Sequence, residues 1–299
     1  MILVTGGTGF IGKPLLRMLY DNGLPVKVLV KPSTKTPDLP KGVPLDIAVS
    51  NLSDQRALRP AFKGVDTIIH LASAEYLGAK GNMLEVDAIG TQNLVEVAAD
   101  AKVKRFIFLS QLGADRASYY PALKVKGIAE DHIRKSGIPF IILRSAMIYG
   151  PQDHFTVPLS RLIKALPFIF LPSGGNNFLQ PIGLQDVLTC LLWSLEPENL
   201  LNQTLDIAGA EYLSFNQIVD DIENTIGAKK RRISVSLPRY RSLTLFLAGM
   251  IHWVDFSTYW VDQLSYDRTC PVDSVLRNFG FLPARFSYSL DYLKPINKS

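Results

Sequence analysis

Residues 1–12 of the chain read MILVTGGTGFIG, and this stretch decides the fold. A short apolar run leads directly into glycines at positions 6, 9 and 12, and an apolar-periodic segment follows at residues 11–20. This order predicts a buried strand, a tight turn and a helix. Gly6 permits a sharp exit from the strand, Gly9 leaves room for a diphosphate at the backbone, and Gly12 lets the helix pack closely. Because the start of a helix attracts phosphate, we expect a dinucleotide at the loop residues Gly6, Thr8, Gly9, Phe10, Ile11 and Gly12.

The composition allows a large folded core and argues against several classes of protein. Of the 299 residues, 47% are hydrophobic, which suffices for one large domain or for a domain with a smaller lobe. The net charge of +5 comes without a clustered basic face or a known motif, so we expect no nucleic-acid partner. The two cysteines and four histidines lack the spacing of paired ligands, and we therefore expect neither a disulfide framework nor a metal site.

The sequence contains no segment typical of a signal peptide or a membrane span. The first predicted strand begins at residue 1 or 2, and no apolar run reaches about 18 residues. We therefore expect a cytoplasmic protein, with peripheral attachment at the inner face of a membrane as the alternative.

Strand and helix patterns alternate along the first 150 residues. We expect buried strands at 26–30, 44–49, 65–73, 105–110 and 138–144, and helices at 56–62, 87–101 and 119–134. This alternation predicts an α/β fold with a doubly wound parallel sheet of the Rossmann type. Loops lengthen after Tyr149-Gly150-Pro151. We therefore expect residues 1–150 to form the dinucleotide-binding core, to which 180–210 return, and 151–179 with 211–299 to form a smaller mixed C-terminal lobe.

The end of the second predicted strand bears on the choice of cofactor. In this fold it faces the adenosine ribose, where an acidic residue favours NAD and a basic one accommodates a 2′-phosphate. Lys31 stands at this position and Lys35 follows closely. The pattern favours NADP(H) over NAD(H), although a lysine that only faces solvent would look the same.

Several phrases together carry a likeness to a known family. The chain resembles an atypical or extended short-chain dehydrogenase/reductase of the epimerase/dehydratase superfamily in TGGTGFIG (5–12), HLA (70–72), GTQNL (90–94), Arg144 and YGP (149–151). It is most similar to the NmrA-like and complex I accessory-subunit branch in FIFLSQLGAD (106–115), QPI (180–182), DV (186–187) and FGFLP (279–283).

The resemblance extends the predicted cofactor site beyond the glycine loop. In such proteins an acidic residue after the third strand contacts adenine; here Asn51 stands there, and its amide can make the contact. The fourth predicted strand ends in small residues, which suit a crossing cofactor. We therefore add four cofactor contacts, Asn51, Leu52, Leu71 and Ala72. His70, next to them, is expected to be structural.

Catalytic members of this family carry, on one helix, a tyrosine four residues before a lysine, and a serine on the preceding strand. The resemblance implies that the tyrosine exchanges a proton, while the lysine lowers the tyrosine pKa and holds the nicotinamide ribose. Tyr120 and Lys124 have this spacing, but the surrounding family sequence matches without gaps only if Lys126 is the lysine. In that register the tyrosine position is Ala122, which cannot transfer a proton.

Two interpretations of the catalytic residues therefore remain open. Pro121 is tolerated in a first helical turn, which places Tyr120 at the start of the helix. Tyr119 lies seven residues before Lys126 and would share its helical face, one turn further away. We favour weak or absent tyrosine chemistry, with Ser110, Tyr120 and Lys126 as candidate catalytic residues and Lys126 as a ribose contact in either case.

The C-terminal lobe contains a basic and apolar segment at residues 229–260. Its basic residues are Lys229, Lys230, Arg231, Arg232, Arg239 and Arg241, and an apolar run at 243–251 and the aromatic residues Trp253, Tyr259 and Trp260 follow. Such a segment is typical of a membrane-surface or partner-binding element, and equally of a core helix flanked by a solvated turn.

The sequence thus predicts an NAD(P)-binding protein with little or no turnover. The resemblance implies a structural or sensing role in a larger respiratory or membrane-associated complex. The alternative is an active NADP-dependent reductase or sugar-nucleotide epimerase/dehydratase acting on a small molecule, with Tyr120 or Tyr119 and Lys124 or Lys126 as its catalytic pair.

Overall fold

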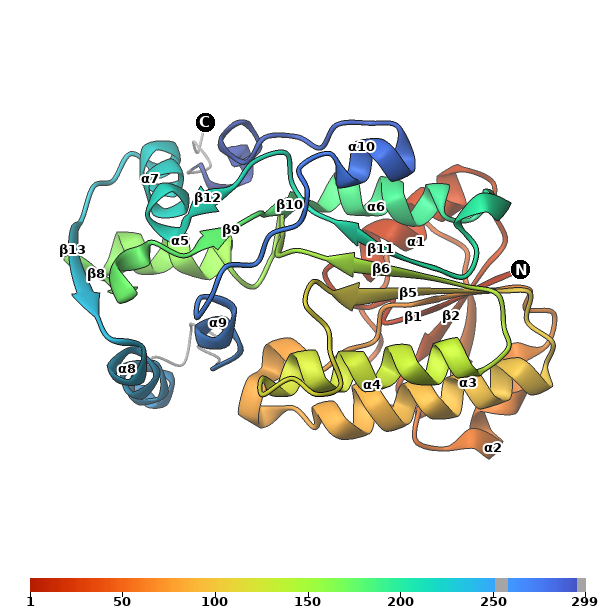
Figure 1. The fold of residues 1–299 in the computed structure, drawn as a ribbon. Helices are drawn as coiled ribbons and strands as arrows, with labels where there is room; N and C mark the ends of the chain where they lie inside the picture. Colours follow the sequence, from red (N-terminus) through yellow and green to blue (C-terminus); the bar gives the residue numbers. More distant parts are fainter. Residues whose placement is uncertain (251–257, 295–299) are drawn as a thin grey trace. The chain divides into compact units, whose positions relative to one another are not determined.

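The alternating strands and helices form a seven-stranded sheet within the described residues, in the order β11-β6-β5-β4-β1-β2-β3 (Figure 1). The computed structural model describes residues 1–250 and 258–294. The strands are β1 Ile2–Thr5, β2 Val26–Val30, β3 Asp46–Val49, β4 Thr67–His70, β5 Arg105–Gln111, β6 Phe140–Ser145 and β11 Gln203–Ile207. β1 pairs in parallel with β2 and β4, as β2 does with β3 and β4 with β5. The predicted α/β class is confirmed.

The strand order reverses at β1. The chain runs outward from β1 to β2 and β3 and then returns to β4 on the other side of β1. In a parallel sheet this reversal opens a crevice at the carboxyl ends of the strands. The register pairs Thr5 with His70 and His70 with Phe108, so these three residues stand in one row across β1, β4 and β5.

The chain divides into two compact units. The first comprises residues 1–75, 81–144 and 188–205, and the second comprises 76–80, 145–187 and 206–299. The sequence prediction had placed the boundary at residue 150 and the returning segment at 180–210.

Helices cover the sheet of the first unit. They are α1 Gly12–Asp21, α2 Gln55–Leu58, α3 Gly90–Asp100 and α4 Pro121–Lys135, and α6 Leu184–Trp193 contributes its later residues. α3 and α4 lie side by side on one face (Figure 1). The predicted helix at 119–134 begins only at Pro121, because the fixed φ of proline suits a first turn, and the extended residue Tyr120 becomes the N-cap. A π-helical turn, Leu84–Ile89, precedes α3.

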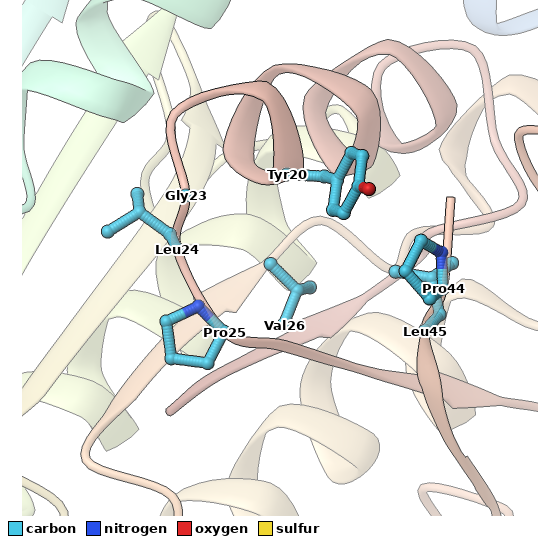
Figure 2. Close-up of a pocket in the computed structure, with 7 residues that line it drawn as sticks. All are labelled: Tyr20, Gly23, Leu24, Pro25, Val26, Pro44 and Leu45. Carbon is cyan, nitrogen blue, oxygen red and sulfur yellow. The ribbon is translucent and has the colours of Figure 1, made fainter. Parts of the chain in front are cut away.

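A shallow pocket of about 260 Å³ opens at the amino end of β2 (Figure 2). It is lined by Tyr20, Gly23, Leu24, Pro25, Val26, Pro44 and Leu45. None of these residues carries a charged or nucleophilic side chain apart from the Tyr20 phenol, and the pocket lies at the end of β2 opposite to Lys31.

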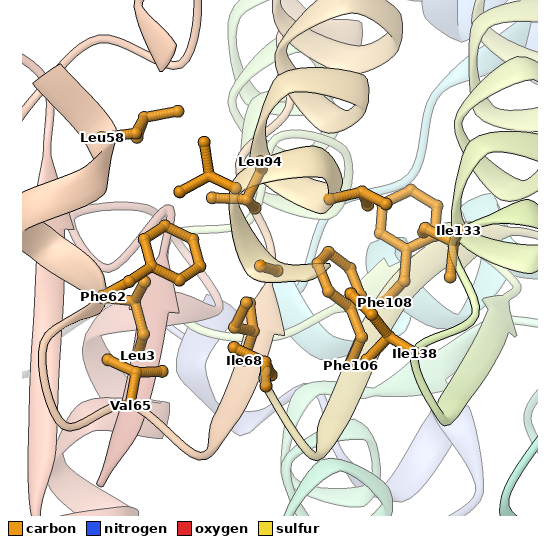
Figure 3. Packing of buried hydrophobic residues seen from close by; sticks show 14 of the residues in the cluster. Leu3, Leu58, Phe62, Val65, Ile68, Leu94, Phe106, Phe108, Ile133 and Ile138 are labelled. Carbon is orange, nitrogen blue, oxygen red and sulfur yellow. The ribbon is translucent and has the colours of Figure 1, made fainter. Parts of the chain in front are cut away.

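The core of the first unit lies between the sheet and α3 with α4. Phe106 and Phe108 of β5 point from the sheet toward the helices, where Leu94 and Ile133 meet them (Figure 3). All four side chains are at most 1% exposed. Burying a side chain of this size contributes about 1.5–3 kcal/mol, so this layer holds β5 and α4 at a fixed separation. The same packing fixes Ser110, two residues after Phe108, against α4.

The described strands of the second unit form short two-stranded sheets, some parallel and some antiparallel. Its helices are α5 Thr156–Ala165, α7 Phe215–Ile226, α8 Leu237–Met250, α9 Thr258–Gln263 and α10 Ser274–Phe279. Three two-stranded pairs complete it: β8 Phe168–Pro172 with β13 Arg231–Val235, β7 Ile148–Tyr149 with β10 Ile182–Gly183, and β9 Phe178–Leu179 with β12 Leu213–Ser214. Ser214 caps α7 through a capping box with Gln217. In the predicted segment 229–260, residues 251–257, Trp253 among them, lie outside the described residues.

Candidate dinucleotide site

The glycine turn after β1 is packed against the backbone that leaves β4. Gly6 has a φ of 72°, which suits the sharp exit expected from the sequence. A Cβ atom at Gly6 would lie 2.7 Å from the Ala72 nitrogen and 2.7 Å from the Leu71 carbonyl carbon. Real Cβ atoms do not come so close to backbone, so the ends of β1 and β4 can adopt this arrangement only around a glycine.

Gly12 and Gly7 make other close contacts than the sequence predicted for Gly12 alone. A Cβ atom at Gly12 would overlap the Gly6 carbonyl oxygen and lie 2.6 Å from the Gly7 Cα, so Gly12 brings the helix onto the loop itself. Gly7 is the glycine that allows the close contact between helix and sheet. A Cβ atom added at Gly7 would lie 2.5 Å from the Val28 side chain and 3.0 Å from the Leu16 side chain. Our sequence analysis had not assigned a role to Gly7, although a second adjacent glycine is a signal of such crowding.

The start of α1 fits a bound diphosphate. No side chain in the described part of the chain caps this helix, and its first turn holds no acidic residue. A Cβ atom at Gly9 would meet one described heavy atom within 4 Å, the Gly6 carbonyl oxygen at 3.2 Å, so the loop surface is otherwise open there. Within the described residues, the N–H groups at the start of α1 therefore meet no side-chain cap and no acidic residue of the first turn, and the positive end of the helix dipole favours an anion there.

The residues expected at the adenosine end follow two neighbouring strands. Lys31 is exposed directly after β2, and Lys35 is exposed nearby in the chain. Asn51 is exposed after β3, and its Oδ1 accepts a hydrogen bond of 3.3 Å from the Ser53 nitrogen. Leu52 is half-buried against Gly90. Lys31 and Asn51 thus follow the carboxyl ends of the parallel strands β2 and β3, at the end of the sheet where β1 leads into the glycine loop.

His70 joins the glycine turn to α3 through a directed set of hydrogen bonds. Its Nδ1 lies 2.6 Å from Thr5 Oγ1, and its Nε2 lies 2.9 Å from Thr91 Oγ1. Thr91 Oγ1 donates its own proton to the Asp87 carbonyl oxygen at 2.6 Å, so it can only accept from His70. The proton of His70 must therefore sit on Nε2, and Nδ1 accepts from the Thr5 hydroxyl. That hydroxyl in turn accepts from the Ala72 N–H at 3.3 Å.

This histidine is fully buried and neutral. Burial, and to a lesser degree the charge of Lys126, lowers the pKa of His70 to about 3. The ring also stacks on Phe108, with 5.4 Å between the ring centroids. His70 is thus a structural residue, which agrees with the expectation from the sequence.

Lys126 is held by two carboxylates beside this network. Its Nζ lies 3.1 Å from Asp87 Oδ1 and 3.7 Å from Glu75 Oε2, and it stands 5.3 Å from the Phe108 ring centroid. The side chain is only 3% exposed. Burial acts to lower the pKa of Lys126, but the charges of Glu75 and Asp87 and their hydrogen bonds together outweigh it and raise that pKa. Lys126 therefore stays an ammonium group.

The helix offers no tyrosine one turn before Lys126. Ala122 occupies that position and is buried. Tyr120 is the N-cap in an extended conformation, and Tyr119, 91% exposed, precedes it. The expectation that Tyr119 shares a helical face with Lys126 is wrong, because the helix begins at Pro121. Lys124, the partner of Tyr120 in the formal spacing, is exposed, whereas Lys126 is buried.

Ser110 donates its hydroxyl proton to a buried carboxylate. Its Oγ lies 2.6 Å from Glu130 Oε1 on α4, and Glu130 is fully buried. Arg144 of β6 binds both oxygens of Glu130, at 2.9 and 2.7 Å, and Arg134 adds a third contact at 2.7 Å. Arg144 also donates to the Ala114 carbonyl oxygen at 3.0 Å. The sequence analysis did not find this network, whose members come from three separate elements.

Comparison with known proteins agrees with this geometry. Residues 6–157, just over half of the chain, match the family described as NAD(P)H-binding. The chain belongs to the NAD(P)H-binding family. This NAD(P)H-binding protein is similar to an assembly factor and to an enzyme subunit. It is 26% identical over 238 residues to the photosystem II assembly factor Ycf39 of Cyanophora paradoxa, covering 79% of this chain and 72% of the relative.

The second relative is named as a mitochondrial subunit of an NADH dehydrogenase. This NAD(P)H-binding protein is 23% identical over 262 residues to subunit 9 of the NADH dehydrogenase [ubiquinone] 1 alpha subcomplex of Arabidopsis thaliana, covering 85% of this chain and 64% of that protein. Among solved structures, triphenylmethane reductase of Citrobacter sp. has a TM-score of 0.79 at 20% identity and covers 98% of both chains. That likeness shows the shared fold.

The residues of this NAD(P)H-binding protein that the structure describes contain no cluster of three or more histidine, cysteine, aspartate or glutamate side chains suited to a metal ion.

We predict that the buried His70 makes the fold sensitive to acid. Because its folded-state pKa is lowered to about 3 from 6.5, its contribution to stability is complete above about pH 6.5 and is lost as the pH falls toward 3. The free energy of unfolding of the wild type should exceed that of His70→Asn at pH 7.5, and the gap should close by about 1.4 kcal/mol per pH unit below pH 6.

Urea unfolding of both proteins, followed by circular dichroism between pH 4 and pH 8, measures this gap. The range from pH 7 to 8 serves as an internal control, since the gap should be constant there. A gap that is independent of pH across the whole range would contradict a neutral, buried His70.

Proposed function

We propose that this chain holds a nicotinamide dinucleotide for a structural or sensing role, with little or no tyrosine-dependent turnover. The observation that carries the proposal is the buried Ala122 one helical turn before Lys126, where catalytic relatives carry the proton-donating tyrosine. When bound, the nicotinamide would supply hydride transfer. Among the candidate proton donors, Ser110 is already hydrogen-bonded to Glu130, and Tyr119 and Tyr120 precede the first residue of α4.

Two further contacts support weak turnover. The Ser110 hydroxyl donates its hydrogen bond to Glu130, so it can accept a hydrogen bond but cannot donate one to a substrate oxygen. Lys126 keeps its positive charge in the pair with Asp87 and Glu75, which suits a donor to a ribose hydroxyl. We therefore assign Lys126 to cofactor binding and not to proton transfer.

We predict that removing either tyrosine hydroxyl leaves the activity of the protein unchanged. Tyr119→Phe and Tyr120→Phe should bind NADPH like the wild type, and all three proteins should oxidise NADPH at the same background rate with a panel of aldehydes, ketones and quinones. A positioned general acid contributes about 10²–10⁴-fold to a rate. If any substrate is turned over by the wild type and lost by a factor of that size in Tyr120→Phe, the protein is an active reductase.

The proposed cofactor preference is for NADP(H). The support is the exposed Lys31 directly after β2, together with Lys35, at the strand end that faces the adenosine ribose in this fold. A charge-assisted hydrogen bond is worth about 1.5–3 kcal/mol, which corresponds to about 10- to 100-fold in affinity.

We predict that Lys31→Glu lowers the affinity for NADPH by about 10- to 100-fold and leaves the affinity for NADH nearly unchanged. Fluorescence titration with both nucleotides measures the two constants. Lys63→Glu, an equal change of charge at an exposed residue before the amino end of β4, should alter neither. An unchanged preference in Lys31→Glu would remove the phosphate role of this lysine.

We further propose that the protein works within a membrane-associated assembly and touches the membrane surface through α8. Relatives named as an assembly factor of photosystem II and as an NADH dehydrogenase subunit support the assembly. On α8, Leu245 is 55% and Phe246 63% exposed, and Arg239 is exposed two turns earlier. Apolar side chains beside basic ones suit an anionic lipid surface. Among the described residues, no helix is both long and apolar enough to cross a membrane.

We predict that the double change Leu245→Asp with Phe246→Asp weakens binding to vesicles of phosphatidylglycerol and phosphatidylcholine by at least about tenfold, because two apolar side chains lose their burial. Co-sedimentation measures the bound fraction. Leu282→Asp, at a leucine that is 68% exposed in the same unit, is the matched control and should bind like the wild type. No binding by the wild type, or equal binding by all three proteins, would reject the membrane contact.

A further inference from the structure

A buried arginine in the second unit makes no ion pair with any described residue. Arg268 follows α9 and pairs with Leu179 of β9 in an isolated parallel bridge, and its backbone nitrogen donates to the Phe178 carbonyl oxygen at 2.9 Å. These backbone contacts fix where the side chain begins. The residue is only 7% exposed, so the side chain runs inward and not into solvent.

The guanidinium group of Arg268 makes no hydrogen bond or ion pair with any residue of 1–250 or 258–294. Its Nε and Nη1 atoms are shielded from solvent and lack an acceptor. The contact that the structure does provide is the Tyr266 ring, whose centroid lies 4.7 Å from the Arg268 Cζ. A ring face attracts a cation but accepts none of the five N–H protons in a strong hydrogen bond.

The energetic consequence is large. An arginine side chain does not give up its proton, so it cannot escape burial by becoming neutral. Burying an ion without a counter-ion costs several kcal/mol, and buried charges in folded proteins are accordingly paired. The first unit follows this rule, since Glu130 is bound by Arg134 and Arg144. Arg268 departs from it, and its unsatisfied donors point to a missing anion.

The described acidic groups nearby do not accept from this guanidinium. Asp262 of α9 lies in the electrostatic field of Arg268, but its Oδ1 lies 3.4 Å from Nη1 of Arg241 on α8. Asp267, next to Arg268 in the chain, is exposed, and its Oδ1 accepts from the Phe178 nitrogen at 2.8 Å. Among the described residues, no carboxylate accepts from Nε or Nη1 of Arg268, and an anionic ligand would supply that acceptor.

We propose that Arg268 is the anchor of an oxyanion-binding site in the second unit, which takes the phosphate or carboxylate group of a ligand. The planar fork of the guanidinium matches the two oxygens of either group, and the Tyr266 ring lies 4.7 Å from its Cζ. Arg241 and Asp262 pair with each other, and Asp262 accepts no hydrogen bond from Nε or Nη1 of Arg268. The site uses no residue of the glycine loop, so it stands independently of dinucleotide binding.

The test compares Arg268→Met with the wild type in thermal unfolding and isothermal titration calorimetry. The probes are inorganic phosphate, pyrophosphate and succinate, each against sodium chloride at equal ionic strength. We expect at least one of these anions to raise the melting temperature of the wild type, and its affinity to fall at least tenfold in Arg268→Met. The phosphate and carboxylate probes tell the two ligand classes apart.

Two controls make the result specific. Arg285→Met removes an exposed arginine of the same unit and should bind the anion like the wild type. Any anion that binds at the glycine loop also binds in Arg268→Met. The difference between the two proteins therefore reports only the anion bound at Arg268. Without added anion, Arg268→Met should unfold at a higher temperature than the wild type, because it no longer buries an unpaired charge.

A second measurement works on the folded wild type alone. The ¹⁵Nε resonance of Arg268, assigned by its absence from Arg268→Lys, should shift when the anion is added and stay in place with chloride. If no probe shifts this resonance, or if all probes stabilise the wild type and Arg268→Met equally, the guanidinium is satisfied by water only and the proposal is overturned.

Discussion

The site depends on one steric constraint, the contact between the backbone of the glycine turn and the backbone that leaves β4. Gly6 has no Cβ, and only therefore can the turn lie against Leu71 and Ala72. Thr5, the last residue of β1, completes the junction, since its hydroxyl accepts from the Ala72 N–H and donates to His70. The close approach of two strand ends thus creates both the cradle for a diphosphate and the hydrogen bonds that lead away from it.

From this junction a continuous set of contacts runs to the residue that would hold the nicotinamide ribose. The His70 ring forms hydrogen bonds with the hydroxyls of both Thr5 and Thr91. Thr91 in turn donates a hydrogen bond to the Asp87 carbonyl oxygen, and the Asp87 carboxylate pairs with the Lys126 ammonium. A neutral histidine can serve here because burial and the nearby lysine keep it unprotonated. The geometry therefore couples the two ends of the proposed cofactor site without any contribution from a tyrosine. Holding a dinucleotide and turning it over are separate properties in this fold, and the first does not require the second.

The buried charges Lys126 and Glu130 of the first unit differ in their partners from the buried Arg268 of the second unit. In the first, Lys126 and Glu130 each have two partners of opposite charge, so the low dielectric of the interior strengthens these pairs. In the second, Arg268 is buried against an aromatic ring while Asp262 is shared with Arg241. A completed network rigidifies a protein, whereas an incomplete one marks a position where a ligand can supply what the chain does not.

Local rules in the sequence determined the architecture. The apolar run and spaced glycines of residues 1–12 act within a dozen positions, and the strand, turn and helix follow from them. Pro121 in the first turn of α4, expected from the sequence, is equally local, as is the cap that Ser214 forms on α7. Each depends on the conformational preferences of neighbouring residues, which a sequence displays directly.

Only the tertiary structure decided which side chains meet. Thr5 and His70 are 65 residues apart and Ser110 and Glu130 are 20 apart, and the sheet register and the packing of α4 bring them together. The sequence showed a serine and a lysine suited to catalysis, but not that Ser110 donates a hydrogen bond to Glu130 or that Asp87 pairs with Lys126. It showed Arg268 as one arginine among many, because burial without a partner is a property of the folded surroundings and not of any local pattern.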